Sequence, residues 1–234
     1  MESTSTDWLT ARKEIVGNAL SIGLAVAMYG VSFGALGTTT GLTVLQTMAL
    51  SLLMFTGASQ FTLVSTLASG GTALTAVVAS WLMGTRNAAY SMRMTAILKT
   101  KGVSRIVAVQ LTIDESTAMG LAQDETSFEG RASRLAFWAT GLSVYLLWNL
   151  ATFIGAVSAT AIGDPKAFGL DAAIAAGLFA LVWPQIKSRI EITAALGGAL
   201  IALTLTPFVS PGIPVLAAAL VAIIIGWTTG RKFL

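Results

Sequence analysis

Residues 15–85 (IVGNALSIGLAVAMYGVSFGALGTTTGLTVLQTMALSLLMFTGASQFTLVSTLASGGTALTAVVASWLMGT) contain no aspartate, glutamate, lysine or arginine. Residues 192–230, near the carboxyl end, are also free of these charges. A water-soluble core does not need uncharged runs of this length, whereas a helix needs about 20 apolar residues to cross roughly 30 Å of hydrocarbon. Both stretches therefore predict helices that cross a membrane.

The composition of the whole chain agrees with this interpretation. Of its 234 residues 55% are hydrophobic and 11% are charged, and the mean hydropathy is +0.78. Soluble domains carry about a quarter charged residues, so this chain cannot cover a water-facing surface. Its small positive surplus lies in loops, where it reports orientation and not a nucleic-acid partner. We predict an all-α, polytopic integral membrane protein.

The apolar segments define the expected organisation. They lie at 15–37, 43–68, 72–98, 104–122, 133–160, 168–186, 192–208 and 212–230. Residues 1–14 are polar and lack the apolar stretch of a signal peptide, so we expect a retained cytoplasmic tail. Residues 15–230 would form a single transmembrane permease domain, and residues 231–234 a cytoplasmic end.

Basic residues predict the orientation, because lysine and arginine are enriched in cytoplasmic loops. Eleven of the fourteen stand at Arg12, Lys13, Lys99, Lys101, Arg105, Arg131, Arg134, Lys187, Arg189, Arg231 and Lys232. All of them reach the cytoplasm if two of the eight segments, 43–68 and 104–122, are broken or re-entrant. Eight plain spans are the alternative, and we favour the first arrangement. Both arrangements place the two termini in the cytoplasm.

Glycine spacing carries two further expectations. Gly30 and Gly34, preceded by Gly23 and Ala27, and later Gly226 and Gly230, are spaced to let helices approach closely. We interpret both pairs as packing inside the bundle, with a subunit interface as the alternative. Gly41-Leu42 and Gly169-Leu170 each open a segment that reaches a glutamine, Gln60 and Gln185, which indicates an internal repeat as in many secondary transporters.

Two polar groups in apolar segments are candidates for binding a solute. Ser59 and Gln60 lie in FTGASQF, where small residues permit unwinding and free backbone groups for an amino acid head group. Arg86 lies near the middle of segment 72–98, where an arginine costs at least about 2.5 kcal/mol without a partner. It would bind a substrate carboxylate or pair with Asp114 or Glu115. The alternatives are an interhelical hydrogen bond by Gln60 and a purely structural ion pair by Arg86.

The other candidates are Asn87 and Asn149 for substrate binding, and Asp114 and Glu115 for proton coupling. Adjacent residues on a helix point about 100° apart, so the two carboxyl groups are expected to have different roles. A carboxyl group in a site of low dielectric constant is suited to binding and releasing a proton near neutral pH. The alternative is a short amphipathic cytoplasmic hairpin with solvated acids.

Missing residue types exclude several classes of protein. The chain has no histidine and no cysteine, which removes thiolate chemistry and the commonest metal ligand. It also lacks the P-loop, HExxH and GxSxG patterns of nucleotide hydrolases, metalloproteases and serine hydrolases. We expect no enzymatic activity, no cofactor and no metal.

Three runs in order resemble the AzlC family: GLTVLQTMALSLLMFTGASQF (41–61), LMGTRNAAYSMRM (82–94) and LTIDESTAMGL (111–121). The second is similar to an Asn-x-Arg-His-x-x-Tyr motif, with Arg86 and Tyr90 in place. Gly84 stands where the family often has asparagine, and Asn87 where it often has histidine. If that histidine carries protons in relatives, Asp114 or Glu115 would have to do so here.

The resemblance implies the large subunit of an exporter of branched-chain amino acids, in some cases methionine. It also implies a small AzlD-type partner of about four spans and coupling to the proton-motive force. Two other classes remain open on the residues alone. A channel-like facilitator would carry a small solute without coupling, and a membrane scaffold would bind no substrate.

Overall fold

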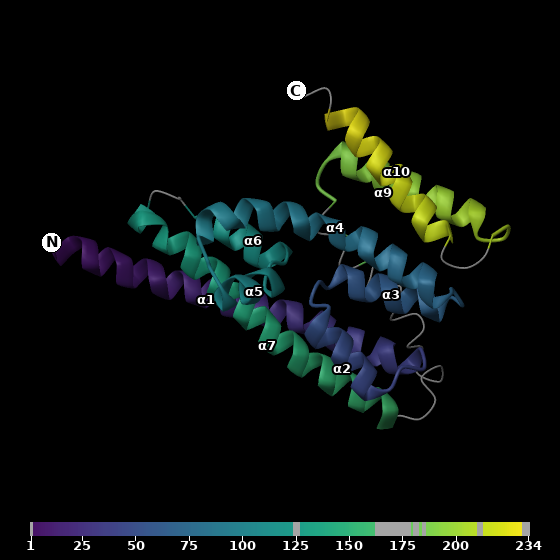
Figure 1. Cartoon of the computed structure of the whole chain (residues 1–234), viewed down its shortest axis with the longest axis horizontal. Coiled ribbons are helices and arrows are strands. Elements are labelled where there is room, and N and C mark those ends of the chain that lie inside the picture. The colour runs from purple at the N-terminus through teal and green to yellow at the C-terminus, as the bar shows by residue number, and fades with distance from the viewer. Residues whose placement is uncertain are drawn as a thin grey trace. The chain divides into compact units, whose positions relative to one another are not determined.

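The computed structural model describes residues 2–123, 127–161, 179, 183, 186–209 and 213–230. The described elements are all helices, and no strand occurs among these residues. They are α1 (Glu2–Thr39), α2 (Val44–Leu53), α3 (Ala58–Ala68), α4 (Ala73–Leu98), α5 (Val103–Gln110), α6 (Asp114–Leu121), η1 (Ser127–Gly130), α7 (Arg131–Ala161), α9 (Arg189–Leu205) and α10 (Ile213–Gly230) (Figure 1). The all-α prediction is confirmed for them. The expected segment 168–186 and most of the second half of the expected repeat lie outside the described residues.

The chain divides into two compact units. Unit 1 comprises Met1–Thr56 and Thr85–Gly163, and unit 2 comprises Gly57–Gly84 and Asp164–Leu234. Helix α4 belongs to both, its amino-terminal half to unit 2 and its carboxyl-terminal half to unit 1. Each unit is described by itself.

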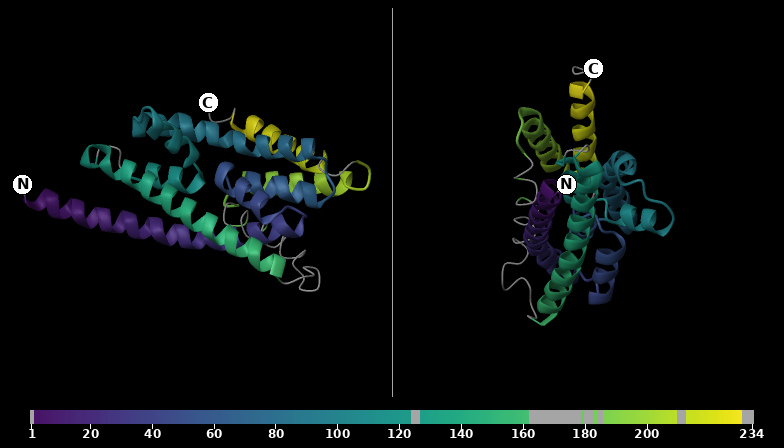
Figure 2. Two further views of the ribbon diagram at one scale, coloured as in Figure 1. Left: turned by 60° about the horizontal axis from the view of Figure 1, so that its bottom comes forward. Right: turned by 90° about the vertical axis from the view of Figure 1, so that its left-hand side faces the viewer.

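Helices α1 and α7 lie side by side along unit 1, and glycines set their separation (Figure 2). A Cβ atom at Gly30 would lie 2.9 Å from the Trp148 carbonyl oxygen. A Cβ at Gly34 would collide with the Thr152 carbonyl oxygen, and one at Gly155 with that of Val31. Close backbone contact of this kind needs residues without side chains. The prediction of internal packing is confirmed for Gly30 and Gly34.

The same interpretation is wrong for Gly226 in α10. Among the described residues, a Cβ at this position would meet no atom within 4 Å. Helix α10 instead packs on α9 through Gly198, whose Cβ would lie 3.6 Å from that of Ala218. The physical reason is that a small residue permits close packing only on the face that a neighbour covers, and Gly226 lies on another face.

The first helix begins earlier than the sequence indicated. Helix α1 starts at Glu2, so the expected tail 1–14 is a continuation of the first segment. Trp8 explains the extension, because its ring lies 5.1 Å from that of Phe128 and the Arg131 guanidinium lies 4.6 Å above it. About two turns further on, Ile15 is buried against the start of α7. These contacts stabilise the helix where the sequence alone is polar.

The two segments expected to be broken are both interrupted. Segment 43–68 forms α2 and α3, and segment 104–122 forms α5 and α6. The second helix of each segment, α3 or α6, is capped at its start. There a side chain accepts a hydrogen bond from the backbone N–H group three residues before it. Gln60 Oε1 accepts from the Gly57 N–H at 3.2 Å, and Ser116 Oγ accepts from the Ile113 N–H at 3.1 Å. Such caps compensate for the backbone bonds that a helix break removes.

Side chains in unit 1 join the ends of α2 and α5 to α7. The Leu52 carbonyl oxygen accepts hydrogen bonds from Gln110 Nε2 at 2.8 Å and from the Tyr145 hydroxyl at 3.3 Å. The Ser51 hydroxyl lies 3.2 Å from that of Thr152. Because Tyr145 lies near the middle of α7, the end of α2 and the end of α5 meet halfway along α7.

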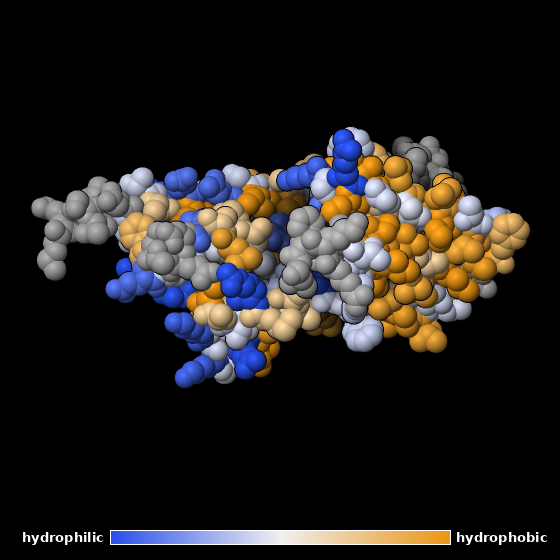
Figure 3. Space-filling model, turned by 90° about the horizontal axis from the view of Figure 1, so that it is seen from above, coloured by the Kyte–Doolittle hydropathy of each residue, from blue (hydrophilic) through white to orange (hydrophobic). Residues whose placement is uncertain are grey.

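Within the described part of the chain, two helices are long and apolar enough to cross a membrane, Trp8–Thr39 and Phe128–Ala161. Two shorter helices, Val44–Leu53 and Ile213–Thr228, are also apolar. Large apolar side chains are widely exposed, as the orange areas of Figure 3 illustrate. They include Leu196, Leu200 and Leu203 of α9 and Leu220, Ile224 and Trp227 of α10. Exposed apolar surface of this extent is typical of a face that contacts lipid or another protein. The number of membrane segments stays a prediction.

Most basic residues of unit 1 gather at one end. The amino-terminal end of α1, the carboxyl-terminal end of α4 and the amino-terminal end of α7 lie together in both views (Figures 1 and 2). These ends carry the basic residues at 12–13, 99–105 and 131–134. This is the arrangement expected if segment 104–122 does not cross the membrane, and the choice between that prediction and eight plain spans stays open.

Candidate functional site

An ion pair joins two of the predicted residues in unit 1. Arg86 Nη2 lies 2.8 Å from Asp114 Oδ2, and the two side chains are 29% and 31% exposed. Arg86 projects from the middle of α4, and Asp114 is the first residue of α6. The break between α5 and α6 therefore places the carboxylate. The sequence left Asp114 and Glu115 open as ion-pair partners of Arg86, and in the structure Arg86 pairs with Asp114.

The pair leaves hydrogen-bonding capacity unused. Arg86 Nε and Asp114 Oδ1 are both buried, and neither has a hydrogen-bond partner among the described residues. Arginine and carboxylate groups can bind each other through two parallel bonds, and here a single contact is made. A ligand that offered both a carboxylate and a cation could therefore find free atoms on both partners.

Tyr90 and Glu115 complete the cluster. Tyr90 lies four residues after Arg86, on the same face of α4, and is close enough to Asp114 to interact with it. Glu115 is half-buried and close enough to interact electrostatically with both Asp114 and Arg86. Both acids occupy the first turn of α6, where the helix dipole favours negative charge. The cluster thus contains one cation, two acids and one phenol.

Asn87 and Asn149 lie in the same unit without a described contact to this cluster. Asn87 follows Arg86 and is half-buried. Asn149 is 8% exposed on α7, and its Nδ2 donates to the Tyr145 carbonyl oxygen at 2.7 Å. Its Oδ1 is buried without a partner among the described residues. Asn149 therefore stabilises α7 next to Tyr145, and its role in binding stays a prediction.

Ser59 and Gln60 belong to unit 2, where both are buried. Gln60 uses its carbonyl oxygen to cap the start of α3. The Ser59 carbonyl oxygen accepts a hydrogen bond from the Ser80 hydroxyl at 3.0 Å, which ties α3 to α4. Gln60 therefore stabilises the helix break and Ser59 the contact between α3 and α4, and nothing in the described contacts tests whether they bind a substrate.

Sequence reasoning missed four residues that build this region. Tyr90 was noticed only within the family motif, and the structure adds its proximity to Asp114. In the sequence, Gln110 near a helix end and Tyr145 in the middle of a helix look like ordinary polar residues. Their hydrogen bonds to the Leu52 carbonyl oxygen depend on the tertiary fold and cannot be read from the sequence. Ser116 could have been predicted from the sequence. It stands three residues after Ile113, the residue that precedes α6, and this is the usual spacing of a capping interaction.

We expect Gln110→Leu and Tyr145→Phe each to lower the free energy of unfolding by about 0.5–1.5 kcal/mol, because each removes one donor from the Leu52 carbonyl group. Thermal or denaturant unfolding in detergent measures the effect. The double variant is expected to lose more than the sum, because the carbonyl oxygen then has no described donor. Two neutral single variants would show that the two bonds do not stabilise the break.

Comparison with known proteins gives one result. A protein-family model described as "AzlC protein" matches residues 21–162, which is more than half of the chain and contains all seven predicted site residues. No curated protein and no solved structure matches the chain.

Proposed function

The chain belongs to the AzlC family, and from this premise we propose that it is a multi-pass subunit of a secondary transporter that exports branched-chain amino acids. The family implies a transport function related to these amino acids. The finer proposal names valine, leucine, isoleucine and methionine as substrates and the bacterial inner membrane as the location. It also includes a small AzlD-type partner subunit, coupling to the proton-motive force, and no enzymatic step.

The observation that carries this proposal is the Arg86–Asp114 pair. An amino acid at neutral pH has a carboxylate and an ammonium group on one carbon. Such an amino acid can replace the Arg86–Asp114 ion pair by two new ion pairs. Its carboxylate would then bind Arg86, and its ammonium group would bind Asp114. The charge in the site is unchanged by this exchange, which keeps its electrostatic cost low in a medium where an unpaired charge is expensive.

The second acid supports a proton-coupled mechanism. One arginine faces two carboxyl groups, Asp114 and Glu115, so one acid has no full countercharge within the cluster. A proton on this surplus acid neutralises it. We propose that the proton bound here and the amino acid bound by the pair are exchanged in one cycle. The Tyr90 hydroxyl, which lies near Asp114, would hold that carboxylate in place while the pair opens.

The location of the pair also fits transport. Asp114 begins the second half of a broken segment whose first half ends at Gln110, next to the end of α2 and the middle of α7. In secondary transporters, substrates commonly bind near the middle of the membrane, where helices are interrupted.

Efflux measurements test the proposal. Cells that lack the gene are loaded with labelled valine, leucine, isoleucine or methionine, and efflux is followed with and without this chain and its small partner. We expect faster efflux of these substrates, lost on addition of an uncoupler, and no change for labelled lysine. If none of the four leaves faster while both proteins are in the membrane, the substrate assignment is wrong. Efflux that persists with an uncoupler would instead contradict proton coupling.

A further inference from the structure

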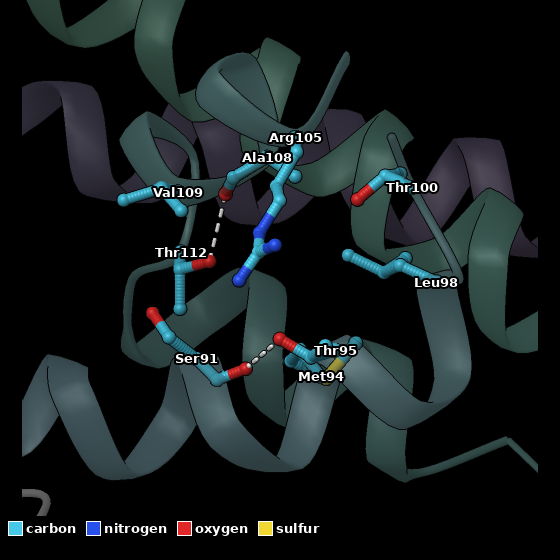
Figure 4. Close-up of a pocket in the computed structure, with 9 residues that line it drawn as sticks. All are labelled: Ser91, Met94, Thr95, Leu98, Thr100, Arg105, Ala108, Val109 and Thr112. Carbon is cyan, nitrogen blue, oxygen red and sulfur yellow. Dashed lines mark hydrogen bonds between the residues drawn. The ribbon is translucent and has the colours of Figure 1, made fainter. Parts of the chain in front are cut away.

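A small open pocket lies between the last turns of α4 and helix α5, within unit 1 (Figure 4). Its apolar wall is made by Met94, Leu98 and Ala108, all of which are buried. The Arg105 side chain projects from α5 into the space between the two helices. The pocket thus has one charged group over an apolar wall.

The charge of this pocket is not balanced by an acid. No carboxylate is present among the described residues that line it, and residues 86–113 contain no aspartate or glutamate at all. The same stretch carries five basic residues, at 86, 93, 99, 101 and 105. The hydroxyl groups of Thr95 and Thr112 donate to backbone carbonyl groups, so Arg105 is the charged donor that the pocket offers. A guanidinium group in such a setting favours an anion, above all a phosphate or carboxylate.

The surroundings favour an amphiphilic anion. Val103, Ile106 and Val109 are exposed on α5, and Val109 also lines the pocket, so an apolar surface continues outward from the charged group. A free anion would use only Arg105, whereas a phospholipid also covers this apolar surface. Basic pockets at the cytoplasmic ends of membrane helices are known to bind lipid headgroups. We propose that this pocket binds the phosphate group of an anionic phospholipid, with the acyl chains along the exposed face of α5.

This proposal goes beyond export and shares with it only the location in a membrane. The test uses the full-length protein purified in a neutral detergent, and the measured quantity is the midpoint of thermal unfolding. Short-chain phosphatidylglycerol, phosphatidylcholine with the same chains, and inorganic phosphate are titrated separately. We expect a saturable increase of the midpoint with phosphatidylglycerol alone.

Variants locate the effect. Arg105→Gln is expected to weaken the response to phosphatidylglycerol at least about tenfold, because a charge-assisted contact is lost. Arg12→Gln removes the same charge from an exposed position of α1 and should leave the response unchanged. If Arg105→Gln already lowers the unfolding midpoint without lipid, Ser91→Leu is used as the pocket variant in its place. Its larger side chain narrows the pocket while Arg105 is kept.

Two outcomes overturn the proposal. An unchanged response of both pocket variants would show that phosphatidylglycerol binds elsewhere. An equal response to inorganic phosphate, lost in the same variants, would identify a site for a free anion and not for a lipid. Because no transport is measured, neither outcome bears on the export proposal, and failure of export would not affect lipid binding.

Discussion

Gly34→Ala is expected to lower the free energy of unfolding by at least about 3 kcal/mol, or to prevent folding, although one methyl group is added. Its Cβ would collide with the Thr152 carbonyl oxygen and lie 2.7 Å from the Ala156 backbone nitrogen. These are backbone atoms of α7, so they cannot rotate away as a side chain would. The two helices must separate, and the buried contacts along their length are weakened together. Unfolding in detergent, followed by tryptophan fluorescence, measures the loss.

Gly17→Ala is the matched control on the same helix. A Cβ at Gly17 would meet no atom within 4 Å among the described residues, and alanine is favoured over glycine inside a helix by about 1 kcal/mol. We therefore expect this variant to be as stable as the natural protein or more stable. Gly155→Ala repeats the test from the α7 side, where the added atom would collide with the Val31 carbonyl oxygen. Equal stability of Gly34→Ala and Gly17→Ala would contradict the close packing of α1 and α7.

The second large effect concerns export. Under the proposed function, Arg86→Gln and Asp114→Asn are each expected to abolish efflux of branched-chain amino acids, because each removes one half of the pair proposed to bind the head group. Each should also lower the free energy of unfolding by about 1–2 kcal/mol. This is less than for a fully buried pair, since both side chains are about one third exposed. Efflux and thermal unfolding are measured on the same variants.

The double variant Arg86→Gln/Asp114→Asn separates binding from stability. It leaves no unpaired charge at these two positions, so most of the lost stability should return, while efflux should stay absent. Lys13→Gln, on an exposed residue of α1, controls for the loss of a charge at the membrane surface and should export normally. Efflux by the double variant would show that the pair is only structural, the alternative that the sequence leaves open.

The sequence predicted the helix breaks because their signals are local. Gly57 has a φ of 58°, a conformation that favours glycine, and it stands in a run of small residues. The acids at 114 and 115 marked the second break, since two adjacent charges are unfavourable in the middle of an apolar span. Propensity and composition are enough for features of this kind.

What could not be predicted depends on contacts between distant residues. Asp114 and Glu115, the two candidate partners of Arg86, are adjacent in the sequence. Which of them reaches Arg86 depends on how α6 is oriented relative to α4. The early start of α1 depends on Trp8 meeting Phe128 and Arg131. The face of Gly226 was misjudged for the same reason, because a spacing of four residues does not tell which side a neighbouring helix covers.

The pairing of α1 with α7 has a consequence for biosynthesis. About 90 residues separate the end of the first helix from the start of its partner. At roughly 5–20 residues per second, a ribosome needs about 5–20 s to make them. During this time the glycine-lined face of α1 has no permanent partner, so the newly inserted helix must be shielded by lipid or by the insertion machinery. Assembly of unit 1 is therefore a late event, completed only after α7 has entered the membrane.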